Sequence, residues 1–348
     1  MLDWLYDYGL FFAQAATVVI AIAVIIALIA RQKASAQRHG GKLVVLDRGE
    51  HFRRRRESLE AARLGPVLGA KARKQWAKLD KRKAKEEKKR APEDGDAVAW
   101  VIDFNGDLRA SATPALTEQV SSLLLAAREG DEVVVRLESG GGLVHAYGLA
   151  AAQLDRLREA KLKLTICVDK VAASGGYMMA CCADRLIAAP FAVVGSIGVV
   201  AQVPNVHRLL KKHDIDVEVL TAGKHKRTLT ILGENTEEGR AKFVEDLIDT
   251  HALFKAYVGA RRPGLAIDEV ADGDIWYGSE AVERGLIDEV GTSEAYLQRR
   301  AEEGKVFELA FKPTRSLAQR LGRQSARAIE RGVERAIERL VQLGWERR

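Results

Sequence analysis

Hydrophobic and polar positions divide this chain into three stretches of different character. No charged residue occurs from Tyr8 to Ala30, and most of that stretch is aliphatic. From Arg31 to Asp96 charged residues dominate, and no wide apolar face recurs at helical spacing. After Ala97, short apolar runs typical of buried strands alternate with segments of helical period. The pattern therefore predicts an apolar helix, a charged linker and a globular domain, in that order.

The apolar stretch is long enough to cross a bilayer. Its 23 residues would span roughly 34 Å as a helix, against a hydrocarbon core of about 30 Å. A cleaved signal peptide is the alternative, and Ala34-Ser35-Ala36 faintly resembles a cleavage site. However, the leader carries two aspartates and no lysine or arginine, whereas a signal peptide begins with positive charge. We therefore predict a short tail over residues 1–8 and an uncleaved transmembrane helix over residues 9–30.

Positive charge is concentrated beside that helix. Between Arg31 and Pro92 there are 21 Lys or Arg residues and 7 Asp or Glu residues, a net charge of +14, whereas the net charge of the whole chain is only +7. Clusters such as Arg53–Arg56 suit nucleic acid, but their place beside a membrane segment favours anionic lipid as the partner. By the positive-inside rule, the same charges predict that the main body lies in the cytoplasm. We predict a basic, partly helical juxtamembrane segment over residues 31–96 and no nucleic-acid partner.

The globular part has the pattern of an α/β fold. Helices are predicted at Pro114–Arg128 and Val144–Glu159, and Asn235 with Glu238 resembles the cap of a further, long amphipathic helix. This alternation of strand and helix is typical of right-handed βαβ crossovers in a parallel sheet. The predicted strands are Ala97–Phe104, Glu132–Glu138, Leu162–Asp169, Leu186–Ala189, Val193–Val200 and Asp216–Leu220.

Two further features are the C-terminal region and the cysteines. Apolar residues at helical spacing among many arginines predict a basic amphipathic helix over residues 313–346, which either docks on its own domain or lies on a membrane surface. The cysteines Cys167, Cys181 and Cys182 match neither a disulfide framework nor a zinc motif. Their apolar contexts predict buried free thiols, which favours a reducing compartment.

The run VDKVAASGGY, from Val168 to Tyr177, contains the first candidate for chemistry. It predicts a buried strand, a tight turn and a helix that begins with two glycines. Such a turn sets the Ser174 hydroxyl beside free backbone N–H groups, which is what a tetrahedral oxyanion needs. Ordinary loop composition is the alternative interpretation of Ala-Ser-Gly-Gly.

A glycine turn, Gly140–Gly142, follows the strand one βα unit earlier. Its backbone can approach a bound carbonyl closely, although a plain strand-to-helix turn would have the same composition. Because the two turns are one unit apart, both would open at the same edge of the sheet.

A serine nucleophile also needs a base. Of the seven histidines only His145 has a plausible context. A lysine can serve if burial lowers its pKa, and Lys224 and Lys226 follow the predicted strand Asp216–Leu220. Both lysines would face the same way on an extended chain, so spacing does not choose between them.

Five stretches closely resemble the signal-peptide peptidase A family of serine-lysine proteases. They are the turn from Glu138 to His145, VDKVAASGGYMMA, GSIGVVAQ, TAGKHKRTLT and IWYGSEAVERGLIDE. The similarity covers essentially the whole chain and implies a ClpP/crotonase-like α/β fold of repeated ββα units over residues 97–300. It implies a serine endopeptidase of the bacterial inner membrane that needs no metal or organic cofactor. It also implies a homo-oligomer and substrates such as hydrophobic peptides and remnant signal peptides.

The resemblance assigns roles to five residues. Ser174 falls on the family nucleophile, Lys226 on the general base, and Ser196 on a hydroxyl that orients the lysine. Gly142 and Gly175 fall on the N–H donors of the oxyanion hole. The family usually has Ser-Pro-Gly-Gly in the first turn; here Gly140 replaces the proline, which loosens the turn.

Two other functions fit parts of the same pattern. A catalytically silent membrane scaffold would keep the fold without the activity. A crotonase-like acyl-CoA enzyme would share the oxyanion hole, but crotonases usually use Glu or Asp and lack a serine nucleophile. The intact set of Ser174, Ser196 and Lys226 favours the peptidase. Relatives work on the outer face of the membrane, which contrasts with the cytoplasmic location that the charges predict.

Overall fold

The computed structural model describes residues 20, 24, 41–87 and 97–313. The chain divides into two compact units, residues 1–42 with 311–348 and residues 43–310. The second unit holds the sheet and the candidate site. In chain order the elements are β1 (Gly41–Asp47), α2 (Arg48–Arg63), α3 (Gly65–Glu87), β2 (Val98–Gly106), α4 (Thr113–Ala126), β3 (Glu132–Ser139), α5 (Val144–Glu159), β4 (Lys163–Val168), β5 (Val171–Ala173), α6 (Gly175–Ala180), β6 (Arg185–Ala188), β7 (Val193–Gly195), α7 (His207–Lys212), α8 (Glu237–Arg261), α9 (Ile267–Val270), β8 (Ile275–Tyr277), α10 (Gly278–Ala281), β9 (Glu289–Val290), α11 (Ser293–Glu303) and β10 (Lys305–Pro313).

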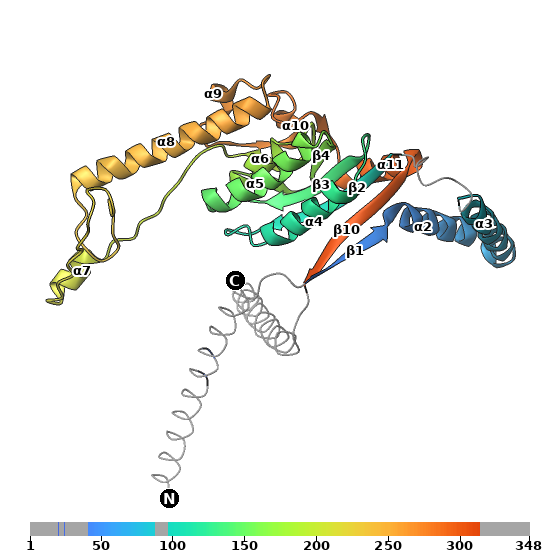
Figure 1. Ribbon diagram of the computed structural model, residues 1–348, viewed down its shortest axis with the longest axis horizontal. Helices are drawn as coiled ribbons and strands as arrows, with labels where there is room; N and C mark the ends of the chain where they lie inside the picture. Colours follow the sequence, from blue (N-terminus) through green and yellow to red (C-terminus); the bar gives the residue numbers. More distant parts are fainter. Residues whose placement is uncertain (1–19, 21–23, 25–40, 88–96, 314–348) are drawn as a thin grey trace, which may run out of the picture. The chain divides into compact units, whose positions relative to one another are not determined.

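A mostly parallel sheet forms the centre of the second unit (Figure 1). Its strands lie in the order β1-β10-β2-β3-β4-β6-β9, and β5 leaves this path to pair with β3 and β7. The pairs from β10 through β9 are parallel, and β8 runs antiparallel to β7. Since α4 joins β2 to β3 and α5 joins β3 to β4, the predicted α/β alternation is confirmed.

Both faces of the sheet are covered, which explains the continuous apolar runs in its strands. On β2, Ile102 and Phe104 belong to a core cluster that includes residues of α4, α5 and α6. The alternate residue Val101 packs instead in a second cluster with Tyr296 and Leu297 of α11. Because side chains alternate along a strand, one short apolar run supplies both layers.

Residues 41–87, which fall in the predicted charged and partly helical linker, form a strand and a helical hairpin. Phe52 of α2 packs against the cluster that contains Tyr296. The hairpin closes tightly, since a Cβ atom on Gly69 of α3 would lie 2.2 Å from the carbonyl oxygen of Ala61 on α2. The packing of Phe52 and the close approach at Gly69 therefore hold this segment in a defined structure, although its many arginines favour exposure to water.

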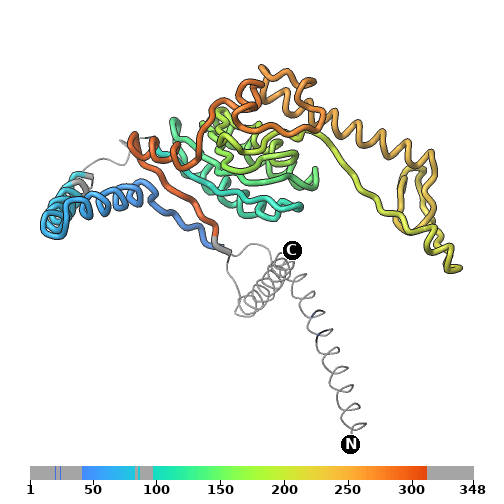
Figure 2. Tube along the Cα trace, turned by 180° about the vertical axis from the view of Figure 1, so that it is seen from behind, coloured from blue at the N-terminus to red at the C-terminus, as the bar shows by residue number. Residues whose placement is uncertain are grey.

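An arm, residues 199–250, leaves the sheet after β7 and returns along α8 (Figures 1 and 2). The predicted strand at Asp216–Leu220 was wrong, because these residues form no strand. The strand predicted to run to Val200 ends at Gly195, since Ser196 adopts a positive φ of 50°. Among the described residues, no neighbouring strand pairs with residues 216–220, although their alternating pattern suits a strand.

Helix α8 is a surface helix with a short buried part. Its cap is Thr236, whose Oγ1 accepts a hydrogen bond from the N–H of Gly239, so the predicted cap at Asn235 was one residue early. The buried residues of α8 are Phe254 and Val258, whereas the neighbouring Leu253 is exposed.

Within the part of the chain that the structure describes, no helix is long and apolar enough to cross a bilayer. The predicted transmembrane helix over residues 9–30 lies outside the described residues except at Ile20 and Val24. The predicted C-terminal helix over residues 313–346 lies outside them beyond its first residue. Both stay predictions.

Candidate active site

Ser174 stands between β5 and α6 in a conformation that few non-glycine residues adopt. Its backbone has φ 53° and ψ −121°, a type of strain that costs about 1–3 kcal/mol and persists where the surroundings enforce it. Here the N–H of Ser174 donates to the carbonyl of Gly195 on β7 (2.8 Å), and its own carbonyl accepts from Met178 of α6 (3.0 Å). A strained serine at a strand-to-helix turn presents its hydroxyl as nucleophile elbows do.

The glycine turn after β3 lies directly against this serine. Ser139 of β3 pairs with Ala172 of β5, which confirms that both turns open at the same edge of the sheet. Gly141 has φ 87°, and a Cβ atom there would lie 2.8 Å from the Cβ of Ser174 and 2.7 Å from the nitrogen of Gly175. Glycine is therefore required for the two turns to approach this closely.

Two backbone N–H groups near the serine are left without a protein acceptor. The N–H of Gly141 donates to Ser139 Oγ (3.0 Å), and the N–H of Leu143 donates to a carbonyl of the loop after β2 (2.9 Å). Between them, the N–H of Gly142 has no acceptor among the described residues, and neither has the N–H of Gly175 at the start of α6. Two N–H donors without an acceptor, placed beside a hydroxyl, are what an oxyanion hole next to a nucleophile requires.

Ser196 holds on β7 the position that Ser174 holds on β5. Ala173 pairs in parallel with Gly195. Each serine is the next residue after this pair, so the two serines occupy equivalent positions at the ends of their strands. Both have a positive φ near 50°, and the N–H of Ser196 is fixed by the carbonyl of Asp274 (2.7 Å). The fold thus brings both predicted hydroxyls to the ends of adjacent strands.

Lys226 lies on the arm and is exposed. Two residues further on, the carbonyl of Thr228 meets α8 at Gly239, where a Cβ atom would lie 2.2 Å from it. On the same helix, His251 Nε2 lies 3.0 Å from the carbonyl of Ile197, next to the serine of β7. A helix rises about 1.5 Å per residue, so these two contact points are roughly 18 Å apart along α8. Within one chain, therefore, the lysine is not brought to the serines.

The other two candidate bases lie at the surface. Lys224 Nζ pairs with Glu238 (3.0 Å), and both side chains are mostly exposed. His145 is exposed on the first turn of α5, immediately after the glycine turn. Among the described residues, no hydrogen bond joins either candidate to Ser174.

A pair of buried hydroxyls behind the glycine turn is part of the site's construction, and sequence reasoning missed it. Tyr147 of α5 is fully buried, and its hydroxyl lies 2.5 Å from Ser139 Oγ. The same hydroxyl donates to the carbonyl of Asp107 (2.8 Å). A tyrosine at helical spacing among apolar residues looks like any core residue, so nothing local in the sequence marked it.

The cysteines are free and buried, as predicted. Burial, reinforced by nearby acidic groups, raises the pKa of Cys167 to about 12, so this thiol is protonated at neutral pH. Within the described ranges, no group of three His, Cys, Asp or Glu side chains could hold a metal ion.

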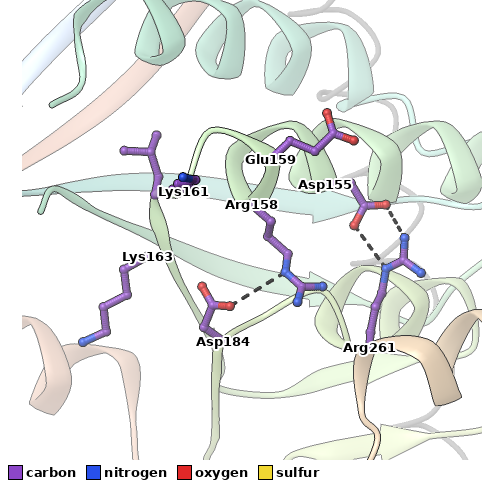
Figure 3. Close-up of a pocket in the computed structure, with 8 residues that line it drawn as sticks. Asp155, Arg158, Glu159, Lys161, Lys163, Asp184 and Arg261 are labelled. Carbon is purple, nitrogen blue, oxygen red and sulfur yellow. Dashed lines mark hydrogen bonds and ion pairs between the residues drawn. The ribbon is translucent and has the colours of Figure 1, made fainter. Parts of the chain in front are cut away.

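A surface pocket of about 670 Å³ lies at the other end of α5. Figure 3 shows two pairs of its charged side chains turned toward each other: Arg261 binds Asp155, and Arg158 lies 3.7 Å from Asp184. Because α5 starts at the glycine turn and the pocket is lined by Asp155, Arg158 and Glu159 near the end of that helix, roughly 17–22 Å of helix separates the pocket from the glycine turn. The pocket is therefore not part of the candidate active site.

Comparison with known proteins identifies the class to which this fold and site belong. The model described as "Peptidase family S49 N-terminal" matches residues 3–154, and that described as "Peptidase family S49" matches residues 156–307. The chain is 45% identical over 335 residues to the "Probable protease SohB" of Haemophilus influenzae, covering 93% of each chain. It is 40% identical over 332 residues to a "Putative protease SohB" of Buchnera aphidicola subsp. Baizongia pistaciae, covering 92% of this chain and 94% of the relative.

The protein is therefore a peptidase with a mixed α/β fold. It belongs to peptidase family S49, within which these relatives are SohB-type proteases, and this confirms the family resemblance seen in its motifs.

Proposed function

We propose that the chain is a membrane-anchored serine endopeptidase with a Ser-Lys dyad. Ser174 is the nucleophile, Lys226 the general base and Ser196 the hydroxyl that orients the lysine. Gly142 and Gly175 supply the N–H groups of the oxyanion hole. The observation that supports this most strongly is the strained backbone of Ser174, which lies beside two N–H groups without an acceptor among the described residues.

In this mechanism a neutral lysine takes the proton of Ser174 as Oγ attacks a peptide carbonyl carbon. The two N–H groups stabilise the negative oxygen of the tetrahedral intermediate. The protonated lysine then gives its proton to the leaving amine, and water hydrolyses the acyl-enzyme. No metal or organic cofactor takes part in these steps.

The lysine in this proposal comes from a second copy of the chain. Support comes from the separation between the arm and the serines, and from the exposure of Lys226 on one copy. A neighbouring copy could place its arm over the serines and shield the amine from water, which favours the neutral form that the mechanism needs. The active enzyme is therefore a homo-oligomer in this proposal.

A serine-reactive fluorophosphonate tests the nucleophile. Full-length protein in native membranes should become labelled, and Ser174→Ala should abolish the label. Ser122→Ala is the matched control, because the Ser122 hydroxyl donates a hydrogen bond to the carbonyl of Glu118 within α4 (2.8 Å). Labelling that persists in Ser174→Ala would refute the assignment.

A catalytically silent membrane scaffold is the second candidate, favoured by the distance between Lys226 and Ser174 in one copy. It predicts a correctly folded wild-type protein that neither labels nor hydrolyses peptides at any concentration. The fluorophosphonate experiment on the assembled protein therefore separates the two functions.

The proposed anchor is the helix over residues 9–30, with the basic segment on anionic lipid of the inner membrane and the catalytic domain in the cytoplasm. A bilayer-spanning helix resists alkaline washing, whereas an interfacial attachment is stripped. The protein should therefore stay in the membrane fraction at alkaline pH, and a reporter fused to the C-terminus should be active in the cytoplasm. Release by alkali would contradict the anchor, and a reporter active only outside would contradict the orientation.

A further inference from the structure

Behind the glycine turn, three hydrogen bonds form an unbroken chain. The N–H of Gly141 donates to Ser139 Oγ (3.0 Å), which lies 2.5 Å from the hydroxyl of Tyr147, and that hydroxyl donates to the carbonyl of Asp107 (2.8 Å). Ser139 is 2% exposed and Tyr147 0% exposed. At this burial, bulk water does not replace a bond that is lost.

The number of hydrogens on each group determines which group donates in each of these hydrogen bonds. A tyrosine hydroxyl has one hydrogen and a carbonyl oxygen can only accept, so the hydrogen of Tyr147 points to Asp107. The bond between the two hydroxyls must then be donated by Ser139, whose oxygen accepts from Gly141. All three bonds run the same way, and aligned bonds of this kind polarise and strengthen one another.

The far end of the chain is held rigidly. The carboxylate of Asp107 accepts hydrogen bonds from the N–H of Ser111 (2.9 Å), the hydroxyl of Ser111 (2.7 Å) and the N–H of Arg109 (3.1 Å). The bonds from Ser111, backbone first, hold the pKa of Asp107 below its usual value. The carboxylate is therefore charged at neutral pH and closes the turn that presents its carbonyl.

Glycines leave the space that Tyr147 occupies. A Cβ atom on Gly106 would lie 2.4 Å from the Tyr147 hydroxyl, and one on Gly175 would lie 2.5 Å from its ring. The tyrosine therefore touches both the strand before the Asp107 turn and the first residue after the nucleophile. A side chain so enclosed has one position for its hydroxyl.

We propose that Ser139 and Tyr147 are positioning residues that hold the glycine turn so that the N–H of Gly142 faces the scissile carbonyl. The N–H groups of Gly141 and Leu143 are both tied back into the protein, so the peptide unit between them is clamped from both sides. Since Gly140 does not restrain the turn as a proline would, the two hydroxyls supply that restraint. This inference rests on the proposed function, in which Gly142 stabilises the oxyanion.

The test compares two tyrosines in the full-length protein. Tyr147→Phe removes the middle of the hydrogen-bond chain and leaves the ring in place. Tyr177→Phe is the matched control, because Tyr177 is also 0% exposed and its hydroxyl donates to a carbonyl, that of Leu286 (2.7 Å), away from the glycine turn. Both variants should lower the melting temperature by similar amounts.

The two variants should differ in catalysis. We expect Tyr147→Phe to lower kcat and the rate of fluorophosphonate labelling by about tenfold or more, with KM changed by less than about twofold, because a misplaced oxyanion donor acts on the transition state. Tyr177→Phe should keep nearly wild-type kinetics. Equal losses in both variants, or no loss in Tyr147→Phe, would overturn the proposal.

Hydrogen exchange separates a failure of this inference from a failure of the proposed function. Amide exchange at residues 139–143 should accelerate in Tyr147→Phe and in Ser139→Ala, but not in Tyr177→Phe. Unchanged exchange would refute the positioning role. If the wild-type protein neither labels nor cleaves peptides, the proposed function fails, and the exchange result alone decides whether the hydroxyls hold the turn. Should Tyr147→Phe not fold, Ser139→Ala takes its place in both measurements.

Discussion

At the scale of single residues, two neighbouring glycines of one turn differ in their tolerance for a side chain. A Cβ atom on Gly141 would lie 2.7 Å from the carbonyl oxygen of Ala173, and its φ is 87°, whereas a Cβ atom on Gly140 would meet nothing within 4 Å. We predict that Gly141→Ala lowers the free energy of unfolding by about 1–3 kcal/mol and abolishes peptide hydrolysis, because the turn must move off Ser174. Gly140→Ala should be close to wild type in denaturant unfolding and in activity; similar effects of the two changes would contradict this account.

Ser196 can be tested separately from the nucleophile. A hydroxyl that accepts a hydrogen bond from the lysine would direct the amine lone pair toward Ser174, and such orientation is worth about tenfold to a hundredfold in rate, or about 1.4–2.7 kcal/mol. Ser196→Ala should therefore lower kcat by that factor with little change in KM or melting temperature. Ser279→Ala, which removes a surface hydroxyl that bonds Pro190, is the control. An unfolded variant, or wild-type turnover, would reduce Ser196 to a turn residue.

At the scale of elements, α11 is fastened to the sheet by one buried carboxylate. Glu132 of β3 is 2% exposed; it accepts hydrogen bonds from the hydroxyl of Thr165 (2.5 Å), from the hydroxyl of Tyr296 and from the guanidinium of Arg300 (2.6 Å). Burial alone would raise the pKa of Glu132, but these hydrogen bonds outweigh it and hold the pKa below its usual value. The ionised carboxylate therefore joins β3, β4 and α11.

Adjacent arginines of α11 should differ in their contribution to stability. Arg300→Met would leave the Glu132 charge buried without its cation, a change that typically costs about 3–5 kcal/mol. Arg299→Met removes a partly exposed pair with Glu289 and a cation–π contact with the ring of Tyr296 (5.7 Å). Each of these is worth about 1 kcal/mol or less at an exposed site. Equilibrium unfolding in denaturant measures both, and equal losses would show that the buried pair has no special role.

The same carboxylate predicts how stability depends on pH. A carboxyl whose pKa is lowered by folding contributes stability that is complete above its usual pKa of 4.5 and is lost as the pH falls through the lower folded value. The melting temperature should therefore decline below about pH 4.5. Glu132→Gln should be less stable at neutral pH and show a weaker decline in acid; an unchanged acid slope would assign the effect to other groups.

How far the sequence predicts this fold depends on how local each signal is. The helix at Val144–Glu159 was predicted with its observed bounds because its apolar spacing alone defines it. The turns at Gly140–Gly142 and Ser174 were found for the same reason, since glycines and a serine mark them directly. The strand expected at Asp216–Leu220 failed because a strand exists only with a partner, and the Ser139–Tyr147 contact was missed because two distant elements create it.

At the scale of the whole molecule, the arm exposes apolar side chains that its own chain does not cover. Leu220 is 88% exposed and Ile248 63% exposed, and Leu209, Ile231 and Leu232 are exposed as well. Scattered apolar residues are normal on a surface, but several on one extended segment are typical of a contact with another protein. Since the same arm carries Lys226, the proposed second copy of the chain would both cover these residues and complete the proposed dyad.

Mixing two inactive variants tests that arrangement. If Ser174 and Lys226 of one active site come from different copies, Ser174→Ala and Lys226→Ala chains should each be inactive alone. When the two are co-expressed and assemble at random, roughly one quarter of the sites would pair an intact serine with an intact lysine, because each partner is supplied independently. Co-expression should therefore restore about that fraction of wild-type peptide hydrolysis, and Lys224→Ala, which removes only a surface pair with Glu238, should be active alone. Assemblies that contain both chains but remain inactive would show that the dyad forms within one copy, by movement of its own arm, or that no dyad forms.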